Sequence, residues 1–289
     1  MNKNMTALVS LFARVYHTRN SNIKIYNDIY GSILLKEDYT NIYNSMKEGI
    51  KYFNKDYKGD NPVKYIVNNH LAPSVLARSI FNENMLLNEI KLGCKQYLIL
   101  ASGYDTSGYK VNNKVKVYEL DKEEVIKDKI ERIKRSNINN KNVNYIPVDF
   151  NKDWIYKLLD SDYNINIKTH VSLLGISYYL DKEIFKYTIK KISNIIPKGS
   201  TIIFDYPNDN ETNKEIINKN LAKEANCDMK STYTKKDILE ISNISNTNIY
   251  VYMNYKDINN TYFYNYNTIN VSNKIIAPRG ISYIMLVKY

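Results

Sequence analysis

From residue 95 onward the chain repeats one pattern, in which a short apolar run is followed by a stretch with helical spacing. The runs are too short for helices and are rich in the β-branched and aromatic residues that favour strands. Runs that are apolar almost throughout are typical of parallel strands buried on both faces. The pattern therefore predicts an α/β fold with one mostly parallel sheet. The five runs cover residues 96–101, 115–121, 143–150, 169–175 and 199–207.

The end of the chain departs from this pattern. Residues 247–255 and 280–289 are both rich in strand-forming residues, and the residues between them show no convincing helix. We expect these two segments to pair as an antiparallel hairpin with a long connection. They bring the predicted sheet to seven strands.

The first 93 residues are predicted to be helical. Leu8, Leu11, Phe12 and Val15 recur at the spacing of one helix face, and a second periodic stretch covers residues 36–53. A third helix is expected over residues 73–93, with a proline in its first turn and a glycine just past its end. Because the sequence contains no low-complexity linker, we expect a single domain of residues 1–289. Residues 1–93 would form a helical cap, and residues 94–289 would form the core with the C-terminal β pair.

The net charge of +11, from 41 basic and 30 acidic residues, first suggests nucleic acid or an anionic membrane as a partner. Only six of the basic residues are arginine, which is the preferred residue for phosphate and base contacts. The remaining lysines are scattered among many Asn, Ile and Tyr residues, all with A/T-rich codons, so codon bias explains the charge. A nucleic-acid partner is therefore disfavoured, although the basic charge keeps it open.

The cysteine and histidine content indicates a cytoplasmic protein without a metal site. Cys94 and Cys227 are far apart and form no CxxC pair, which fits a reducing compartment. The three histidines are dispersed and give no zinc-ligand spacing. No stretch approaches 18 consecutive apolar residues, and the first residues lack the features of a signal peptide. We therefore expect no association with a membrane.

Three signals follow the ends of successive predicted strands, where ligands bind in open α/β sheets. The first is the small-residue turn Ala101–Ser102–Gly103, which lets backbone N–H groups approach a ligand. By itself this turn is more typical of an ordinary connection between a strand and a helix.

The other two signals are acidic. Glu119 or Asp121, about 20 residues after the glycine turn, can accept hydrogen bonds from ribose hydroxyls. Asp149 can accept a hydrogen bond from an adenine amino group, and Phe150 can pack on the adenine ring. Each acid could instead cap the helix that follows it. Together the three signals predict a bound adenosine moiety.

Six blocks of the sequence, in the same order, resemble the class I S-adenosylmethionine-dependent methyltransferases of the leucine carboxyl methyltransferase and polyketide O-methyltransferase group. The block YLILASGYDTSGYKV resembles the family turn LGAGxDTRxxRL, and VYELD and YIPVDF resemble its E-x-D and P-V-D-L segments. The six blocks cover residues 6–28, 76–81, 97–111, 117–129, 145–154 and 172–180. The resemblance implies a Rossmann-like fold, S-adenosylmethionine as cofactor and S-adenosylhomocysteine as product.

The resemblance also implies roles for individual residues. Arg78 matches the arginine that holds the methionine carboxylate, and Arg14 lies where a second basic residue contacts the same group. The alternative for Arg78 is a surface salt bridge on its helix. The remaining matches are Ala101 and Gly103 for the methionine part, Asp121 with Glu119 for ribose, Asp149 with Phe150 for adenine, and Leu174 beside the cofactor.

This sequence departs from the family at several of these positions. Ala101 replaces a glycine of the turn, Leu174 replaces a glutamate, and Ser107 and Lys110 replace arginines. These changes keep open a non-catalytic homologue that works through protein contacts.

Methyl transfer is a displacement at the sulfonium methyl, for which the protein supplies alignment and a dry pocket. A carboxylate acceptor needs no base, whereas a hydroxyl acceptor does, and His17 in the cap is the candidate base. A structural histidine is the alternative for His17. Tyrosines could line an aromatic pocket, namely Tyr16, Tyr104, Tyr178, Tyr179 and those of residues 262–267.

The sequence thus predicts an S-adenosylmethionine-dependent O-methyltransferase acting on a carboxylate or hydroxyl of a small organic, polyketide-like acceptor. A non-catalytic homologue and a nucleic-acid methyltransferase are the alternatives. The sequence makes no prediction of the oligomeric state.

Overall fold

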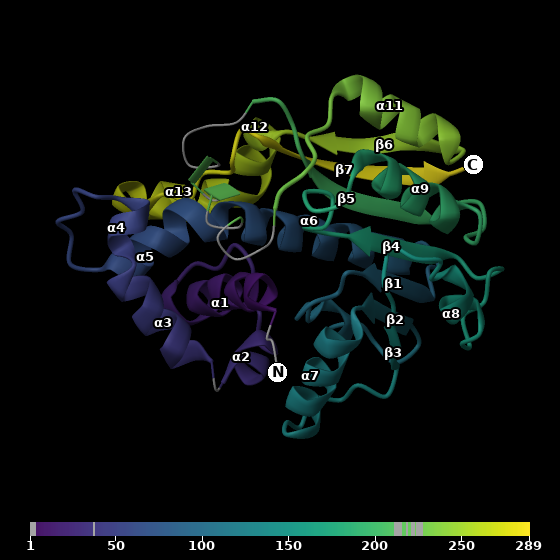
Figure 1. Cartoon of the computed structure of the whole chain (residues 1–289), viewed down its shortest axis with the longest axis horizontal. Helices are drawn as coiled ribbons and strands as arrows, with labels where there is room; N and C mark the ends of the chain where they lie inside the picture. Colours follow the sequence, from purple (N-terminus) through teal and green to yellow (C-terminus); the bar gives the residue numbers. More distant parts are fainter. Residues whose placement is uncertain (1–3, 37, 211–215, 218, 221–222, 224–227) are drawn as a thin grey trace.

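The computed structural model describes residues 4–36, 38–210, 216–217, 219–220, 223 and 228–289. Within these residues, seven strands form one sheet in the order β3-β2-β1-β4-β5-β7-β6 (Figure 1). Strands β1 to β5 pair in parallel, and β7 lies antiparallel between β5 and β6. This confirms the Rossmann-like, mostly parallel sheet with an antiparallel C-terminal pair. The strands are β1 Gln96–Leu100, β2 Lys116–Asp121, β3 Val143–Pro147, β4 Thr169–Leu173, β5 Thr201–Pro207, β6 Thr247–Met253 and β7 Ile281–Lys288.

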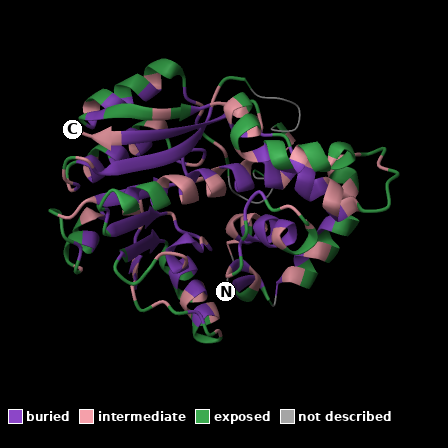
Figure 2. Cartoon of the chain, turned by 180° about the vertical axis from the view of Figure 1, so that it is seen from behind, coloured by how far each residue is buried: buried purple, intermediate pink, exposed green. Residues whose placement is uncertain are grey.

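The central strands are apolar throughout because both faces of the sheet are covered. Every residue of β1, β4 and β5 is buried. Along β1, Tyr97 and Ile99 belong to one hydrophobic cluster, and Leu98 and Leu100 belong to another on the opposite face. The buried colour of these strands contrasts with the exposed residues of the edge strand β6 (Figure 2).

Helices on the two faces complete the layers. Leu158 of α8, Ile189 of α9 and Ile241 of α11 pack in one cluster, and Phe81 of α6 packs in the other. Helix α6 contacts β4, β5 and β7, so the last helix before residue 94 packs on the sheet itself. The α-helices are α1 Met5–Asn20, α2 Gly31–Leu35, α3 Tyr39–Glu48, α4 Ile50–Phe53, α5 Pro62–Ile66, α6 Ala72–Lys91, α7 Glu123–Lys134, α8 Ile155–Leu159, α9 Lys182–Ser193, α11 Lys235–Ile244, α12 Tyr255–Ile258 and α13 Tyr264–Ile269. Shorter helical segments are η1 Val67–Leu71, η2 Ser107–Tyr109, η3 Asn259–Phe263 and η4 Val271–Asn273.

The predicted N-terminal helix forms the inner part of the cap. In α1 the four residues of the predicted apolar face, Leu8, Leu11, Phe12 and Val15, have no exposed surface. They belong to the same hydrophobic cluster as Tyr97 of the sheet, so the cap and the core share one interior. Helices α1 to α5 lie together beside the sheet (Figure 1).

The expectation of no helix between the last two strands is wrong, because α12, η3 and α13 lie there. Helix α12 begins with a capping box in which Asn254 and Asp257 each accept a backbone N–H from the other. Ile258, Phe263 and Tyr266 of this segment are buried in the same cluster as the cap. A π-helical turn lies between these residues, so their spacing does not follow the 3.6-residue period that identifies a helix in sequence.

Of the two cysteines, Cys94 is a buried free thiol, and Cys227 lies outside the described residues. Among the described helices, none has the length and apolar character that a membrane span requires.

Candidate functional site

The turn after β1 has an unusual backbone. Gly103 has φ +49° and Ala101 has φ +52°, and both values lie in the left-handed region. A side chain in this region is strained by roughly 1–2 kcal/mol, which glycine avoids. Ala101 therefore carries strain at the position where the resembling family has glycine.

Asp121, at the end of β2, points directly at this turn. Its Oδ2 accepts the N–H of Gly103 at 2.7 Å, and its Oδ1 accepts the N–H of Lys122 at 2.7 Å. The side chain is buried, and this burial raises its pKa even though both backbone hydrogen bonds lower it. Two of the three predicted adenosine signals are thus joined by a hydrogen bond.

Glu119 is committed elsewhere. It forms a fully buried ion pair with Lys129 of α7, and the same ammonium donates to the backbone oxygen of Asp105 at 2.6 Å. Burial raises the pKa of Glu119 to about 7, although Lys129 opposes this shift. Of the two predicted ribose acids, Asp121 is the one that accepts a backbone N–H of the glycine turn.

Sequence reasoning missed Lys129. It follows Val125 by four residues and precedes Ile133 by four, so it lies on the apolar stripe of α7. A lysine on such a stripe is a signal for a buried ion pair, because an unpaired buried charge is strongly unfavourable.

Asp149 and Phe150 follow β3 at the same edge of the sheet. Asp149 Oδ1 accepts from the backbone and side-chain nitrogens of Asn151 at 3.0 and 3.2 Å, and the pKa of Asp149 is lowered, mainly by the backbone bond. The ring of Phe150 packs edge-on against Trp154 at 5.2 Å. Asp149 and Trp154 line an open depression of about 460 Å³ together with Lys122. Of the two predicted adenine residues, Asp149 therefore borders a hollow between the ends of β2 and β3, and Phe150 packs against Trp154 in its wall.

Arg78 projects from α6 toward the turn after β4. Its Nη2 donates to Ser10 Oγ at 3.2 Å, and its Nη1 lies 3.8 Å from Oδ2 of the buried Asp205. A Cβ placed on Gly175 would lie only 2.6 Å from Nη1, so the guanidinium group rests against the backbone of this turn. Leu174, partly buried, precedes that glycine. The partner of Arg78 is an interior carboxylate, so the alternative of a surface salt bridge is wrong.

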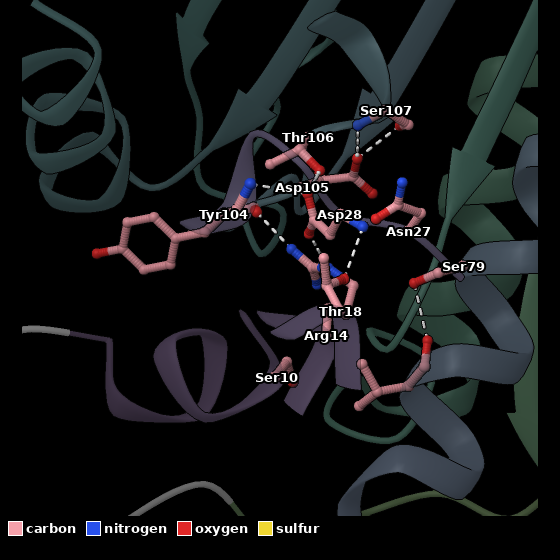
Figure 3. Close-up of polar contacts among 12 residues, drawn as sticks. Ser10, Arg14, Thr18, Asn27, Asp28, Ser79, Tyr104, Asp105, Thr106 and Ser107 are labelled. Atoms are coloured by element: carbon pink, nitrogen blue, oxygen red, sulfur yellow. Dashed lines mark hydrogen bonds and ion pairs between the residues drawn. The ribbon is translucent and has the colours of Figure 1, made fainter. Parts of the chain in front are cut away.

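Arg14 joins the cap to the turn after β1 (Figure 3). Its Nε donates to Asp28 Oδ2 at 2.7 Å, and its Nη2 donates to the backbone oxygen of Tyr104 at 2.7 Å. Asp28 Oδ1 also accepts from Thr106 Oγ1 at 2.6 Å. Arg14 thus fastens α1 over the glycine turn.

His17 is held inside the cap. Its Nε2 accepts the N–H of Ile25 at 2.9 Å, and its Nδ1 lies 3.1 Å from Ser21 Oγ. Burial lowers the pKa of His17 to about 4. Both ring nitrogens have partners in the protein, which favours the alternative of a structural histidine for His17.

Most of the tyrosines named as a pocket lining belong to, or pack against, the hydrophobic cluster that the cap shares with the sheet. The hydroxyl of Tyr104 donates to Asp128 of α7, and that of Tyr178 donates to Asp205 at 2.9 Å. Tyr16 is buried in α1, and Tyr266 packs on His17 with ring centroids 5.5 Å apart. These contacts give Tyr104, Tyr178 and Tyr266 partners within the protein, and the aromatic pocket stays a prediction.

The sequence and the fold match known methyltransferases. The model of the leucine carboxyl methyltransferase family matches residues 7–193. A Bacillus subtilis (strain 168) protein provisionally named S-adenosyl-L-methionine-dependent methyltransferase YktD is 32% identical over 302 residues, which are 98% of this chain and 97% of that protein.

Two solved structures share the fold at low sequence identity. A DUF574 family protein from Streptomyces avermitilis has a TM-score of 0.62 at 11% identity, over 98% of this chain and 97% of that one. Magnesium protoporphyrin IX methyltransferase from Synechocystis PCC 6803, crystallised with bound S-adenosylhomocysteine, has a TM-score of 0.51 at 11% identity, over 87% and 100% of the two chains. The family match and the end-to-end similarity to YktD show that this chain belongs to the leucine carboxyl methyltransferase family and is an S-adenosylmethionine-dependent methyltransferase.

Proposed function

We propose that this enzyme methylates an oxygen of a small organic acceptor, and that the acceptor group is a carboxylate. The observation that best supports the site is the hydrogen bond between Gly103 and Asp121 at the carboxyl ends of the parallel strands. Arg78 lies near the same edge of the sheet, beside Asp205 of β5. The observation that favours a carboxylate is the engagement of both His17 nitrogens, because a carboxylate acceptor needs no base.

The residues at this edge fit the cofactor. Each oxygen of Asp121 accepts one hydrogen bond from the protein and retains a second lone pair, which suits the two hydroxyls of ribose. The glycine turn brings backbone close to the neighbouring methionine part. Asp149 lines the depression that would hold adenine, and Phe150 packs against Trp154 in its wall.

Arg78 is placed for the methionine carboxylate. Its side chain is 18% exposed, and the hydrogen bond to Ser10 uses one of its five N–H groups. Arg14 donates to Asp28 and Tyr104, so its contribution is to fix the cap above the turn. Leu174 adjoins Gly175 and would offer the cofactor an apolar contact at the position where the resembling family has a glutamate.

The bound cofactor supplies an activated methyl group on a positively charged sulfur. The protein aligns this methyl with the acceptor oxygen and excludes water from both. Helix α1 can exclude water because it packs directly on the glycine turn: a Cβ added to Gly103 would lie only 3.3 Å from the Cβ of Ala7. Carboxylate attack moves no proton, so alignment and a dry site suffice.

The arrangement of the arginines also supports a small acceptor rather than nucleic acid. Arg14 pairs with Asp28, Arg78 with Asp205, and Arg132 with Asp128 and Asp38. With the pair of Arg135 and Glu131, four of the six arginines form ion pairs within the protein, which leaves few for the bidentate contacts that nucleic-acid recognition prefers.

The test is a methyl-transfer assay with labelled S-adenosylmethionine and a panel of small carboxylic acids and phenols. We expect label in methyl esters, which mild base hydrolyses to methanol, and none in base-stable methyl ethers. Label confined to ethers would overturn the carboxylate assignment. The Asp121→Ala variant is the control, because any label that it incorporates at the wild-type rate does not depend on the proposed cofactor site.

A further inference from the structure

Asp205, at the carboxyl end of β5, is a fully buried carboxylate at the centre of the Arg78 cluster. It accepts the N–H of Gly175 at Oδ1, 2.6 Å away, and the hydroxyl of Tyr178 at Oδ2, 2.9 Å away. The same Oδ2 lies 3.8 Å from Nη1 of Arg78. One side chain therefore links α6, the turn after β4 and the end of β5.

These contacts fix where the guanidinium group can lie. Gly175 has φ +70°, and a Cβ there would approach Arg78 Nη1 to 2.6 Å and Nη2 to 3.3 Å. The group thus lies directly against a turn whose own N–H is held by Asp205. Burial and the charge of Asp205 raise the pKa of Tyr178 well above its ordinary value, so its hydroxyl remains a donor to that carboxylate.

The opposite charges of Asp205 and Arg78 explain why the position of the guanidinium group depends on Asp205. A buried carboxylate is tolerated only when charged or polar partners surround it, and Asp205 has Arg78 as its cation. An arginine that binds an anion loses less freedom on binding when its plane is already fixed. Ser10 holds the opposite Nη2 at 3.2 Å, so the guanidinium group is restrained from both ends.

We infer that Asp205 is a positioning residue that aims Arg78 at the amino-acid end of the cofactor. The inference rests on the proposed function of Arg78, through which the fully buried Asp205 would act on the cofactor. It predicts selectivity: loss of the Asp205 charge weakens ligands that carry the methionine carboxylate and spares ligands that lack it.

The test compares two ligands in calorimetric titrations of Asp205→Asn. S-adenosylhomocysteine carries the amino-acid end, and 5′-methylthioadenosine keeps the adenosine and the sulfur without it. Asparagine retains an oxygen for the Gly175 N–H and removes the charge that faces Arg78. We expect the Kd of S-adenosylhomocysteine to rise about tenfold or more, as for the loss of a hydrogen bond to a charged group, and that of 5′-methylthioadenosine to change less than about threefold.

Two further variants sharpen the result. Arg78→Ala should show the same selectivity, and the double variant with Asp205→Asn should be no weaker than Arg78→Ala alone, because both remove one interaction. Glu89→Gln is the matched control. Glu89 lies on α6 with Arg78 and is a buried carboxylate like Asp205, but its partner is Lys168 at 2.8 Å. Both ligands should bind this variant as they bind the wild type.

Equal losses for the two ligands, unchanged binding, or tighter S-adenosylhomocysteine binding in Asp205→Asn would each overturn the inference. If that variant does not fold, Tyr178→Phe replaces it, because it removes a donor from Asp205 and keeps the charge; we expect a smaller loss confined to S-adenosylhomocysteine, and equal losses would count against the inference. Failure of the wild type to bind either ligand would instead contradict the proposed function.

Discussion

The backbone N–H of Gly103 donates to the side chain of Asp121 at 2.7 Å, which joins the turn after β1 to the acid at the end of β2. This bond sets the orientation of the carboxylate before any ligand binds. Because β1 and β2 pair in parallel, with Leu100 opposite Leu120, the two groups reach the same edge of the sheet. The site is thus a direct product of the register of two neighbouring strands.

Replacing Asp121 should weaken every ligand that contains the ribose. We expect Asp121→Ala to raise the Kd of S-adenosylhomocysteine and that of adenosine by a similar factor of about ten or more, since hydrogen bonds to a charged group contribute roughly 1.5–3 kcal/mol. Calorimetric titration measures both. A loss confined to S-adenosylhomocysteine would place Asp121 at the amino-acid end and contradict the assignment.

Ala101→Gly should relieve strain at the turn. The left-handed φ of +52° disfavours alanine by roughly 1–2 kcal/mol, whereas glycine adds about 0.4–1 kcal/mol of unfolded-state entropy. We expect the free energy of unfolding in urea to stay constant or rise by up to about 1 kcal/mol. Ala77→Gly, within α6, is the control and should be destabilised by roughly 1 kcal/mol. A loss of that size at Ala101 would show that the turn is unstrained.

Asp28 should stabilise the cap only as a carboxylate. Burial alone would raise its pKa, but the charge of Arg14 and the hydrogen bonds from Arg14, Thr106 and Gly31 outweigh this and lower it. The stabilisation is therefore complete above the unfolded pKa of about 3.9 and is lost as pH falls through the lower, folded pKa. At pH 7 we expect Asp28→Asn to lose about 3 kcal/mol, since it leaves Arg14 buried without its partner.

The pH dependence of that loss can be followed by urea unfolding. The difference between wild type and Asp28→Asn should be constant from pH 7 to about pH 5 and should shrink below about pH 4. A difference that stays constant through this range would mean that the charge of Asp28 contributes nothing.

His17 should affect stability and leave catalysis in place. Its pKa of about 4 lies below the ordinary 6.5, so the unfolded chain binds more protons between these values. Stability should therefore rise between about pH 4 and 6.5, and His17→Gln should flatten part of this rise, because its amide oxygen can still accept the Ile25 N–H without taking a proton. We expect the kcat of this variant to stay within about threefold of the wild type. A fall of about a hundredfold or more would identify His17 as a base.

The features that could be predicted from the sequence are those that neighbouring residues determine. The strand within residues 96–101 could be predicted because a short, unbroken apolar run is typical of a buried strand, and Asp121 could be predicted as a site residue because it ends such a run. The same reasoning applies to Asp205, an acid near the end of a buried strand, and would have singled it out. The Arg14–Asp28 pair was beyond prediction, because it depends on a bend between them and on the Tyr104 carbonyl, 90 residues from Arg14.

The helices between β6 and β7 illustrate the other limit. Their buried residues follow a π-helical turn, and tertiary packing against the cap determines their conformation. Likewise, His17 looked available for catalysis in the sequence, and only the contacts with Ile25 and Ser21 revealed that its nitrogens are occupied.

The cofactor site at the edge of β1 and β2 is tested most directly by a calorimetric titration of the folded wild-type protein with S-adenosylhomocysteine. We expect one site per chain with a Kd at or below about 100 μM, which corresponds to a binding free energy of roughly −5.5 kcal/mol. No heat of binding at millimolar S-adenosylhomocysteine would contradict it.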